Sequence, residues 1–293
     1  MPPSVLVLTG VVSVQVGAGL AARLFTQIPP AAVTALRLWT AAALMAVAGA
    51  RPLRQNLAAL VRRRSWRDAA VVAAFGLTLA VMNFSIYQAF SRIPLGIAVT
   101  IEFLGPLAVA VATSRRLIDL LWVALAGAGV ALLTGTGSPA GGHGIDLVGL
   151  AFALLAGASW AAYIILSRAT GRRFPGASGL TMAMLVAAVV IVPVGVTAGR
   201  GALLRPGILA TGLAIGLLSS IIPYTLELEA LRRVPARVFG IWMSLEPAVA
   251  ALVGLVMLGQ ALAVSEWAAI VCVMVACAGA ARGSARPSQA PEA

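Results

Sequence analysis

The sequence predicts an all-α integral membrane protein of ten transmembrane helices, arranged as two inverted five-helix repeats with both termini in the cytoplasm. Three observations lead to this fold class. The 293-residue chain is 61% hydrophobic and only 10% charged, whereas a soluble domain is about 25% charged. Apolar runs close to the roughly 20 residues that cross a bilayer recur along its whole length. Finally, a segment of the first half of the chain recurs in the second half.

The apolar runs define the expected spans, which follow one another with short connections. The first run is expected to be a transmembrane helix, because no basic segment precedes it and it is longer than the apolar core of a signal peptide. The longest connection, residues 51–68, is arginine-rich and carries Trp66 as an interfacial anchor. The expected spans are 4–22, 30–50, 69–90, 95–113, 117–135, 147–167, 178–198, 207–231, 235–258 and 266–282.

The net charge of +12 follows from the expected topology. All 21 basic residues are arginine; with a cytoplasmic amino terminus, sixteen fall on the cytoplasmic side, four fall outside and Arg37 lies within a span. Cytoplasmic loops of membrane proteins carry such an excess of basic residues. The lipid bilayer therefore accounts for the basic character, and nucleic acid is excluded as a partner.

An internal repeat relates the fourth and ninth spans at a constant offset of 141 residues. Both spans are entered through an Arg-x-Pro turn. Ala89, Arg92, Pro94, Leu104, Pro106 and Ala110 recur as Ala230, Arg233, Pro235, Leu245, Pro247 and Ala251. Five spans per half is an odd number, so the halves must cross the membrane in opposite senses, as in secondary transporters. The expected domains are a first repeat at 1–141, a second, inverted repeat at 142–283, and a disordered cytoplasmic tail at 284–293.

Two glutamates lie deep within these repeated spans. Glu102 and Glu246 are each roughly 10–17 Å from the nearer end of their helices at 1.5 Å per residue, and Pro106 and Pro247 interrupt those helices. Ionisable residues at such depth usually face a bundle interior or a cavity, and paired proline-interrupted helices point to a transporter's binding site. The alternative is that each glutamate is hydrogen-bonded within the bundle and braces a kink. At the offset of 141, the counterpart of Glu102 is Met243.

Two further charged groups have competing interpretations. Glu227 lies about 6 Å from the cytoplasmic end of its span, so it either takes part in transport or extends its carboxylate to the interface. The Arg37 guanidinium is able to bind a substrate carboxylate bidentately, to pair with Glu102, or to reach the outer interface.

The remaining candidates are neutral side chains at membrane depth, each of which either lines a cavity or packs between helices. They are Gln15, the i,i+4 pair Asn83 and Tyr87, the i,i+3 pair Trp160 and Tyr163, and Trp242 with Ser244 beside the second proline break. Cys272, Cys277 and His143 have neither the number nor the spacing of a disulfide framework or a metal site. We expect no metal and no cofactor.

At these residues the sequence resembles EamA-type carriers of the drug/metabolite transporter superfamily. The likeness is carried by IEFLGPLAVAV (101–111) and PYTLELEALRRVPARVFG (223–240), supported by TALRL (34–38) and GASWAAYIILS (157–167). It runs over nearly the whole chain and is greatest to the inner-membrane exporters of threonine and homoserine. The resemblance implies two inverted five-helix repeats, a central cavity closed alternately from either side, and export of small amino acids. It carries over Gln15, Arg37, Glu102, Trp160, Tyr163, Tyr224, Glu227, Glu246 and Pro247.

The sequence therefore predicts a secondary transporter in a bacterial-type inner membrane, a monomer or homodimer, that exports amino acids by alternating access. The substrates expected are threonine- or homoserine-like, or also aromatic or broad in range, and the driving ion is the proton, with Glu102, Glu246 and Glu227 as coupling candidates. Glu102 or Glu246 would bind the substrate ammonium, and Arg37, Gln15 or half-helix N-termini its carboxylate. An exporter of drugs or lipophilic cations is the alternative. A membrane enzyme or a channel is disfavoured, because no metal cluster or nucleophile–base pair is present.

Overall fold

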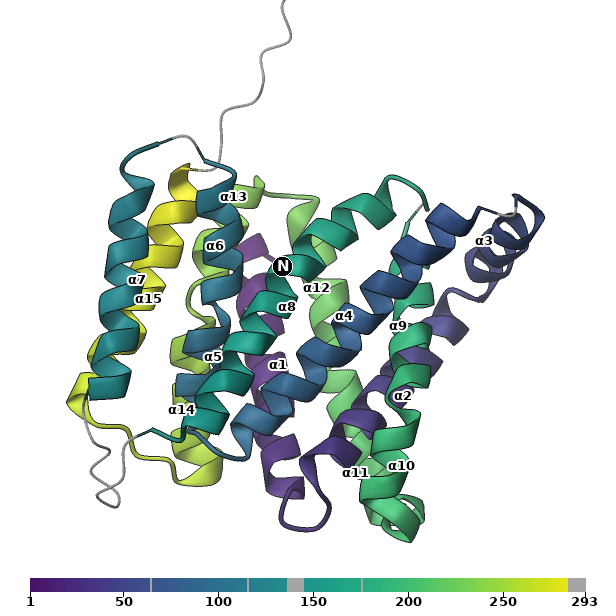
Figure 1. Cartoon of the computed structure of the whole chain (residues 1–293), viewed down its shortest axis with the longest axis horizontal. Coiled ribbons are helices and arrows are strands. Elements are labelled where there is room, and N and C mark those ends of the chain that lie inside the picture. The colour runs from purple at the N-terminus through teal and green to yellow at the C-terminus, as the bar shows by residue number, and fades with distance from the viewer. Residues whose placement is uncertain (64, 115, 136–144, 175, 284–293) are drawn as a thin grey trace, which may run out of the picture.

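The computed structural model describes residues 1–63, 65–114, 116–135, 145–174 and 176–283. Every regular element in these ranges is a helix (Figure 1). Within them, eight helical segments are long and apolar enough to cross a membrane, and a bent pair makes nine if it is one span. The all-helical membrane fold is thus confirmed. The expectations for His143 and for the tail 284–293 concern residues outside these ranges.

The helices follow the predicted spans in order. Those of the first half are α1 (Pro3–Leu24), α2 (Pro30–Ala48), α3 (Ala50–Arg63), α4 (Trp66–Phe90), α5 (Leu95–Glu102), α6 (Leu104–Ala112) and α7 (Asp119–Gly135). Those of the second half are α8 (Leu147–Gly171), α9 (Ser178–Val190), α10 (Val192–Gly199), η1 (Arg200–Leu204), α11 (Pro206–Gly216), η2 (Leu217–Ile221), α12 (Ile222–Leu231), α13 (Ala236–Met243), α14 (Glu246–Leu258) and α15 (Val264–Gly283). The apolar part of α7, Asp119–Leu133, is shorter than a full span, so the tenth crossing stays a prediction.

Local sequence explains many of the helix starts. Proline occupies the first or second position of α1, α2, α10, α11, α12 and α14, where the missing N–H is no loss and the fixed φ favours the helix. The Asp146 carboxylate caps α8 by accepting hydrogen bonds from the amides of Val148 and Gly149. The break between α9 and α10 bends that pair by 46°, next to Pro193.

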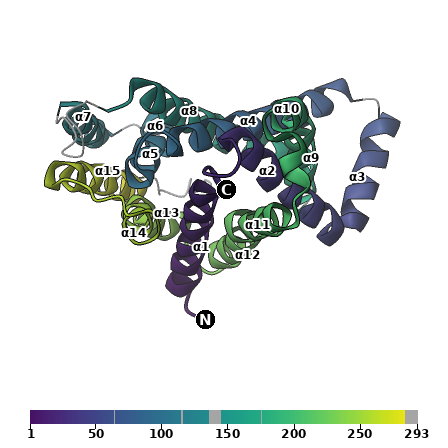
Figure 2. The same ribbon diagram turned by 90° about the horizontal axis from the view of Figure 1, so that it is seen from below.

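The connection predicted at 51–68 contains a helix, α3, which the sequence analysis did not anticipate. Leu53 is buried in a cluster with Val72, Phe174 and Met182, while Arg51 and Arg54 are exposed. This separation of apolar and basic faces is typical of an amphipathic helix lying along an interface. Figure 2 shows α3 lengthwise at one edge of the molecule, whereas Figure 1 shows it nearly end-on.

The ends of the helices define two faces of the bundle. On the terminal face, where α1 begins and α15 ends, Arg233 after α12 donates a hydrogen bond to the carbonyl of Met1, and Gly283 lies beside Asp119 at the start of α7. The opposite face carries the turns between α1 and α2 and between α4 and α5. The pair α7 and α15 pack side by side at one end of the molecule, and α3 lies at the other (Figures 1 and 2).

The fourth and ninth predicted spans are both broken, and at equivalent positions. α5 ends and α6 begins around Phe103, and α13 and α14 are separated at Ser244, which is 141 residues further on. α5 packs against α14. The left-handed turn at Gly259 ends α14, after which the Gln260 side chain accepts a hydrogen bond from the amide of Leu95 and caps α5 (2.9 Å). The two interrupted helices are therefore neighbours, tied together at the opposite face.

Candidate functional site

A cavity of about 170 Å³ lies at the centre of the bundle, between helices of both halves of the chain. We call it the central cavity. It lies where the interrupted helices α5, α13 and α14 face α1, α2, α4, α8 and α12. Its polar and aromatic lining consists of Gln15, Arg37, Asn83, Phe90, Glu102, Trp160, Tyr163, Ser219, Tyr224, Glu227 and Glu246. Nine of the predicted site residues thus meet at one place.

Glu246 at the start of α14 is held by Gln15 of α1. The Gln15 amide nitrogen donates a hydrogen bond to Glu246 Oε1 (2.9 Å), joining residues 231 positions apart. Both side chains are buried, and both retain an oxygen without a partner, Gln15 Oε1 and Glu246 Oε2. Buried polar atoms are normally satisfied. These two oxygens are therefore acceptors available to a donor that enters the cavity.

Arg37 of α2 directs its guanidinium inward, and it forms no ion pair with Glu102 among the described residues. Its Nη2 donates to the carbonyl of Ser219 (3.1 Å) and its Nη1 lies 3.5 Å from the Tyr87 hydroxyl. The guanidinium carbon lies 5.4 Å from the Tyr87 ring centroid, in cation–π range. Nε is buried without a partner. The interpretation in which Arg37 reaches the outer interface does not fit this geometry.

The acceptor for Arg37 belongs to η2, a π-helical turn between α11 and α12. π-turns occur frequently at functional sites. Ser13 donates to the carbonyl of Leu218 (2.8 Å), and Gly17 of α1 lies directly against Ser219. The turn is thus held by α1 on one side and by Arg37 on the other.

Glu102 reaches the central cavity because α5 ends at this residue and crosses α8 closely. A side chain at Gly105 would meet the carbonyl oxygen of Gly157 at 1.9 Å, and one at Gly157 would meet the carbonyl of Glu102 at 2.8 Å. Only glycine permits this approach of the two backbones. Met243, the repeat counterpart of Glu102, lines the same cavity. Pro106 lies one residue after Gly105, in the first turn of α6, where its missing N–H is tolerated.

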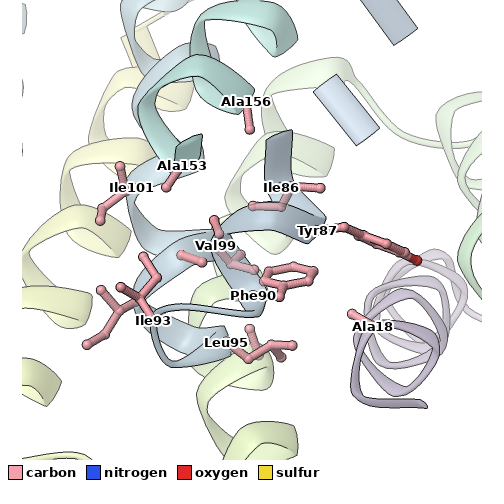
Figure 3. Close-up of a cluster of buried hydrophobic side chains, with 14 of the residues drawn as sticks. Ala18, Ile86, Tyr87, Phe90, Ile93, Leu95, Val99, Ile101, Ala153 and Ala156 are labelled. Carbon is pink, nitrogen blue, oxygen red and sulfur yellow. The ribbon is translucent and has the colours of Figure 1, made fainter. Parts of the chain in front are cut away.

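Aromatic rings lie between the central cavity and the opposite face. Tyr87 is completely buried, with its ring centroid 6.0 Å from Phe25 and 5.8 Å from Phe90. Figure 3 shows the Tyr87 oxygen directed away from the surrounding apolar cluster.

Near the opposite face, Arg23 at the end of α1 donates two hydrogen bonds to the carbonyl of Met257 in α14 (2.7 and 3.0 Å).

A second cavity of about 540 Å³ adjoins the first on the terminal face, and we call it the vestibule. Trp160, Tyr163, Glu227 and Met243 line both cavities. Exposed residues at the end of α8 and the start of α13, Arg168 and Arg237, form its rim. Glu227 therefore lies between the two cavities, which argues against its being only an interfacial residue.

Asn83 is one of the nine residues at the central cavity, whereas Trp242, Ser244 and Pro247 lie outside both cavities. Asn83 lines the central cavity and donates a hydrogen bond to the Leu79 carbonyl (2.8 Å). Trp242 packs in the cluster of Leu6, Val7 and Val11, and Ser244 donates to Ile241 within its own turn (2.6 Å); neither lines the two cavities. Pro247 is buried in the first turn of α14.

Sequence reasoning missed several lining residues. They include Met82, Ser219 and Pro223 in the central cavity and Arg168 and Arg237 in the vestibule. The serine pair 219–220 within an otherwise apolar run, directly before Pro223, was an available signal, because polar pairs and prolines in a span mark interrupted helices. Nothing in the sequence marked Arg168 and Arg237 as cavity residues, since the excess of arginine in cytoplasmic loops accounts for both.

Comparison with known proteins identifies the family. The sequence model of the EamA-like transporter family matches residues 147–282. Threonine/homoserine exporter RhtA of Escherichia coli (strain K12) is 39% identical over 277 residues, which cover 94% of this chain and 90% of the relative. The chain belongs to the EamA-like transporter family. RhtA of Salmonella typhimurium (strain LT2) gives the same identity and coverage.

Two further proteins are similar to this chain in part of its sequence or in fold. The uncharacterized transporter YwfM of Bacillus subtilis (strain 168) is 31% identical over 131 residues, 45% of this chain. A solved crystal structure covers 94% of the chain with a TM-score of 0.62 at 21% identity, which supports the fold alone. As an EamA-like protein with eight or nine membrane-length helices among its described residues, the chain is a transporter and not an enzyme, and a multi-pass protein of a bacterial-type inner membrane.

The contact between Gly17 and η2 leads to a first prediction. In Gly17→Ala the new Cβ would lie 2.2 Å from Ser219 Oγ and 3.2 Å from the Ser219 amide, so the Ser219 hydroxyl has to rotate and η2 has to shift slightly, and we expect transport to fall. Gly10→Ala on the same helix is the control, because its Cβ meets nothing closer than 3.7 Å. Transport in proteoliposomes and the thermal midpoint in detergent measure the effect. Equal behaviour of the two variants would contradict it.

Proposed function

We propose that this EamA-like transporter exports small neutral amino acids of the threonine and homoserine kind from the cytoplasm, driven by protons. The observation that carries the proposal is that Arg37 and the carboxylates of Glu102 and Glu246 face one small central cavity. An amino acid has a carboxylate, whose charge complements that of Arg37, and an ammonium group, whose charge complements that of the glutamates. The 39% identity to threonine/homoserine exporters over nearly the whole chain supports the same substrate class.

The two ends of the substrate have distinct partners in this proposal. The unpartnered Nε of Arg37 and the adjacent nitrogens present a planar donor set, which matches a carboxylate bidentately. The free oxygens Glu246 Oε2 and Gln15 Oε1 accept hydrogen bonds from the ammonium group, which has three donors and no acceptor. The unpartnered hydroxyl of Ser219 is available near Arg37.

The size of the central cavity favours a small solute. Since a water molecule occupies about 30 Å³ in the liquid, a space of about 170 Å³ holds several water-sized groups. A lipophilic cation would leave the Arg37 charge unpaired beside it, which is unfavourable in a low-dielectric site. Drug or cation export is therefore the second candidate, separated from amino acid export by the test below.

Alternating access through two inverted repeats is part of the proposal. The packing pattern supports it: α1 packs on α12 as α4 packs on α8, while α2 with α9 and α7 with α15 pair as counterparts. The family match to 147–282 is close to the expected second repeat, 142–283. With both termini cytoplasmic, the vestibule would open to the cytoplasm, and the rings of Tyr87 and Phe90 would close the other side. Glu102, Glu227 and Glu246 are the proposed proton carriers.

Counterflow in proteoliposomes tests the function directly. Vesicles loaded with unlabelled threonine should accumulate labelled threonine when they contain the protein. External threonine and homoserine should compete, whereas threonine amide, which lacks the carboxylate for Arg37, and tetraphenylphosphonium should not. Competition by tetraphenylphosphonium without competition by amino acids would establish the cation exporter instead. A dependence of net export on an imposed pH gradient tests the proton coupling.

A further inference from the structure

The vestibule has two charged residues of its own, Arg168 and Arg237, and shares Glu227 with the central cavity. Arg168 at the end of α8 and Arg237 at the start of α13 line it together with Glu227 of α12. No ion pair or side-chain hydrogen bond joins these three residues to any described residue. Two arginines and a glutamate without an ion-pair partner among the described residues thus line one cavity.

Other arginines of the terminal face differ from this pair. Arg173 pairs with Asp68 (3.0 Å), and Arg232 and Arg233 pair with Glu229. Arg172, which follows α8, is exposed and lines neither the vestibule nor the central cavity. An excess of basic residues from membrane topology accounts for arginines on this face, but it does not require two of them to share a cavity with an unpaired carboxylate.

The walls of the vestibule are aromatic and apolar. Trp160, Tyr163, Phe103 and Phe239 line it, and Trp160 packs edge-on against Phe103 at a centroid distance of 4.9 Å. Its volume of about 540 Å³ lies in the range of about 300–1,000 Å³ of small-molecule sites. Small-molecule sites combine apolar walls with a few convergent polar groups. In the vestibule these polar groups are two positively charged arginines and the negatively charged Glu227.

We propose that the vestibule is a second binding site for zwitterionic amino acids, where Arg168 and Arg237 bind the carboxylate and Glu227 binds the ammonium group. This inference rests on the proposed function and deepens it. Because Glu227 also lines the central cavity, it is in reach of the ammonium group at both sites. The substrate passes from the vestibule to Glu246 and Arg37 without losing the partner of its positive charge. The larger volume of the vestibule accepts side chains too bulky for the central cavity in this conformation.

The test compares three single substitutions, Arg168→Gln, Arg237→Gln and Arg172→Gln, in proteoliposomes with the vestibule face accessible. We expect KM for threonine to rise about tenfold in the first two, the effect of one charge-assisted hydrogen bond, with the maximal rate within twofold of wild type. Arg172→Gln, which removes the same charge from the same end of α8, should keep the wild-type KM. Arg168→Lys and Arg237→Lys, which keep the charge, should recover part of the loss.

Equilibrium binding provides a second readout that does not depend on transport. In detergent, a Glu246→Gln protein should retain weak threonine binding at the vestibule, and adding Arg237→Gln should abolish it while adding Arg172→Gln does not. If wild-type protein shows threonine counterflow but KM and residual binding are the same in all three arginine variants, the vestibule site is refuted and the proposed function stands. If wild-type protein shows no amino acid counterflow, the proposed function itself is refuted.

Discussion

Glu246→Gln should abolish amino acid counterflow while leaving the protein folded in the membrane. Glutamine keeps the shape of the side chain and an oxygen that accepts the hydrogen bond from Gln15. It removes the negative charge, however, and places an amide nitrogen among the acceptors for the ammonium group. Losing a charge-assisted hydrogen bond costs about 1.5–3 kcal/mol, so we expect substrate binding to weaken about tenfold to a hundredfold and counterflow to be lost at threonine concentrations near the wild-type KM. The measurement is counterflow of labelled threonine in proteoliposomes.

The control for this prediction is Glu229→Gln. Glu229 lies two residues beyond Glu227 on α12, but it pairs with Arg232 and Arg233 at the surface and lines neither the central cavity nor the vestibule. It should retain nearly full counterflow, because exposed ion pairs contribute little. Wild-type counterflow by a correctly inserted Glu246→Gln protein would contradict a role for Glu246 in substrate binding.

Gly105→Ala should destabilise the protein and suppress transport. The added Cβ would lie 1.9 Å from the carbonyl oxygen of Gly157, and the three nearest atoms all belong to the Gly157 backbone, so α6 has to move away from α8. Overpacking of this kind typically costs about 1–3 kcal/mol. Because the carbonyl of Glu102 belongs to the same crossing, the movement also displaces a carboxylate of the central cavity. Thermal unfolding in detergent and counterflow together measure the two effects.

Gly127→Ala is the matched control for the crossing. Gly127 lies in the middle of α7, and a Cβ there meets no atom within 4 Å. Alanine favours a helix interior over glycine by roughly 0.5–1 kcal/mol, so this variant should be as stable as wild type or slightly more stable. If both variants unfold at the wild-type temperature, α6 and α8 do not cross as closely as described.

The spans were predictable because a bilayer imposes a simple length requirement on the sequence. Predicted limits such as 4–22 and 266–282 differ by one or two residues from Pro3–Leu24 and Val264–Gly283. The matched breaks around Phe103 and Ser244 were also predictable, since proline cannot continue a helix without loss of a hydrogen bond. Helix α3 does not follow from the charge of 51–68; the sequence signal for it is the i,i+4 spacing of Leu53 and Leu57, which is typical of an amphipathic helix.

The central cavity was predictable only in part. Glu102, Glu246 and Arg37 are recognisable from sequence, because a charged side chain at membrane depth requires a protein or cavity partner. Trp160 and Trp242 look equivalent in sequence, yet Trp160 lines both cavities and Trp242 packs against α1. These helices are apolar on all sides, so hydrophobic periodicity does not indicate which face is turned inward.

By itself, the sequence determined the membrane class, the order of the spans, the matched helix breaks and the ionisable residues that lie at depth. Only the tertiary structure decided which of them meet: Gln15 with Glu246, Arg37 with the carbonyl of Ser219, and Arg168 with Arg237 across one vestibule. The physical reason is that the thickness of the lipid bilayer sets the length of each span, and this length is visible in the sequence as the length of an apolar run. The partners of a side chain depend instead on helix rotation and crossing, set by backbone contacts such as that of Gly105 with Gly157.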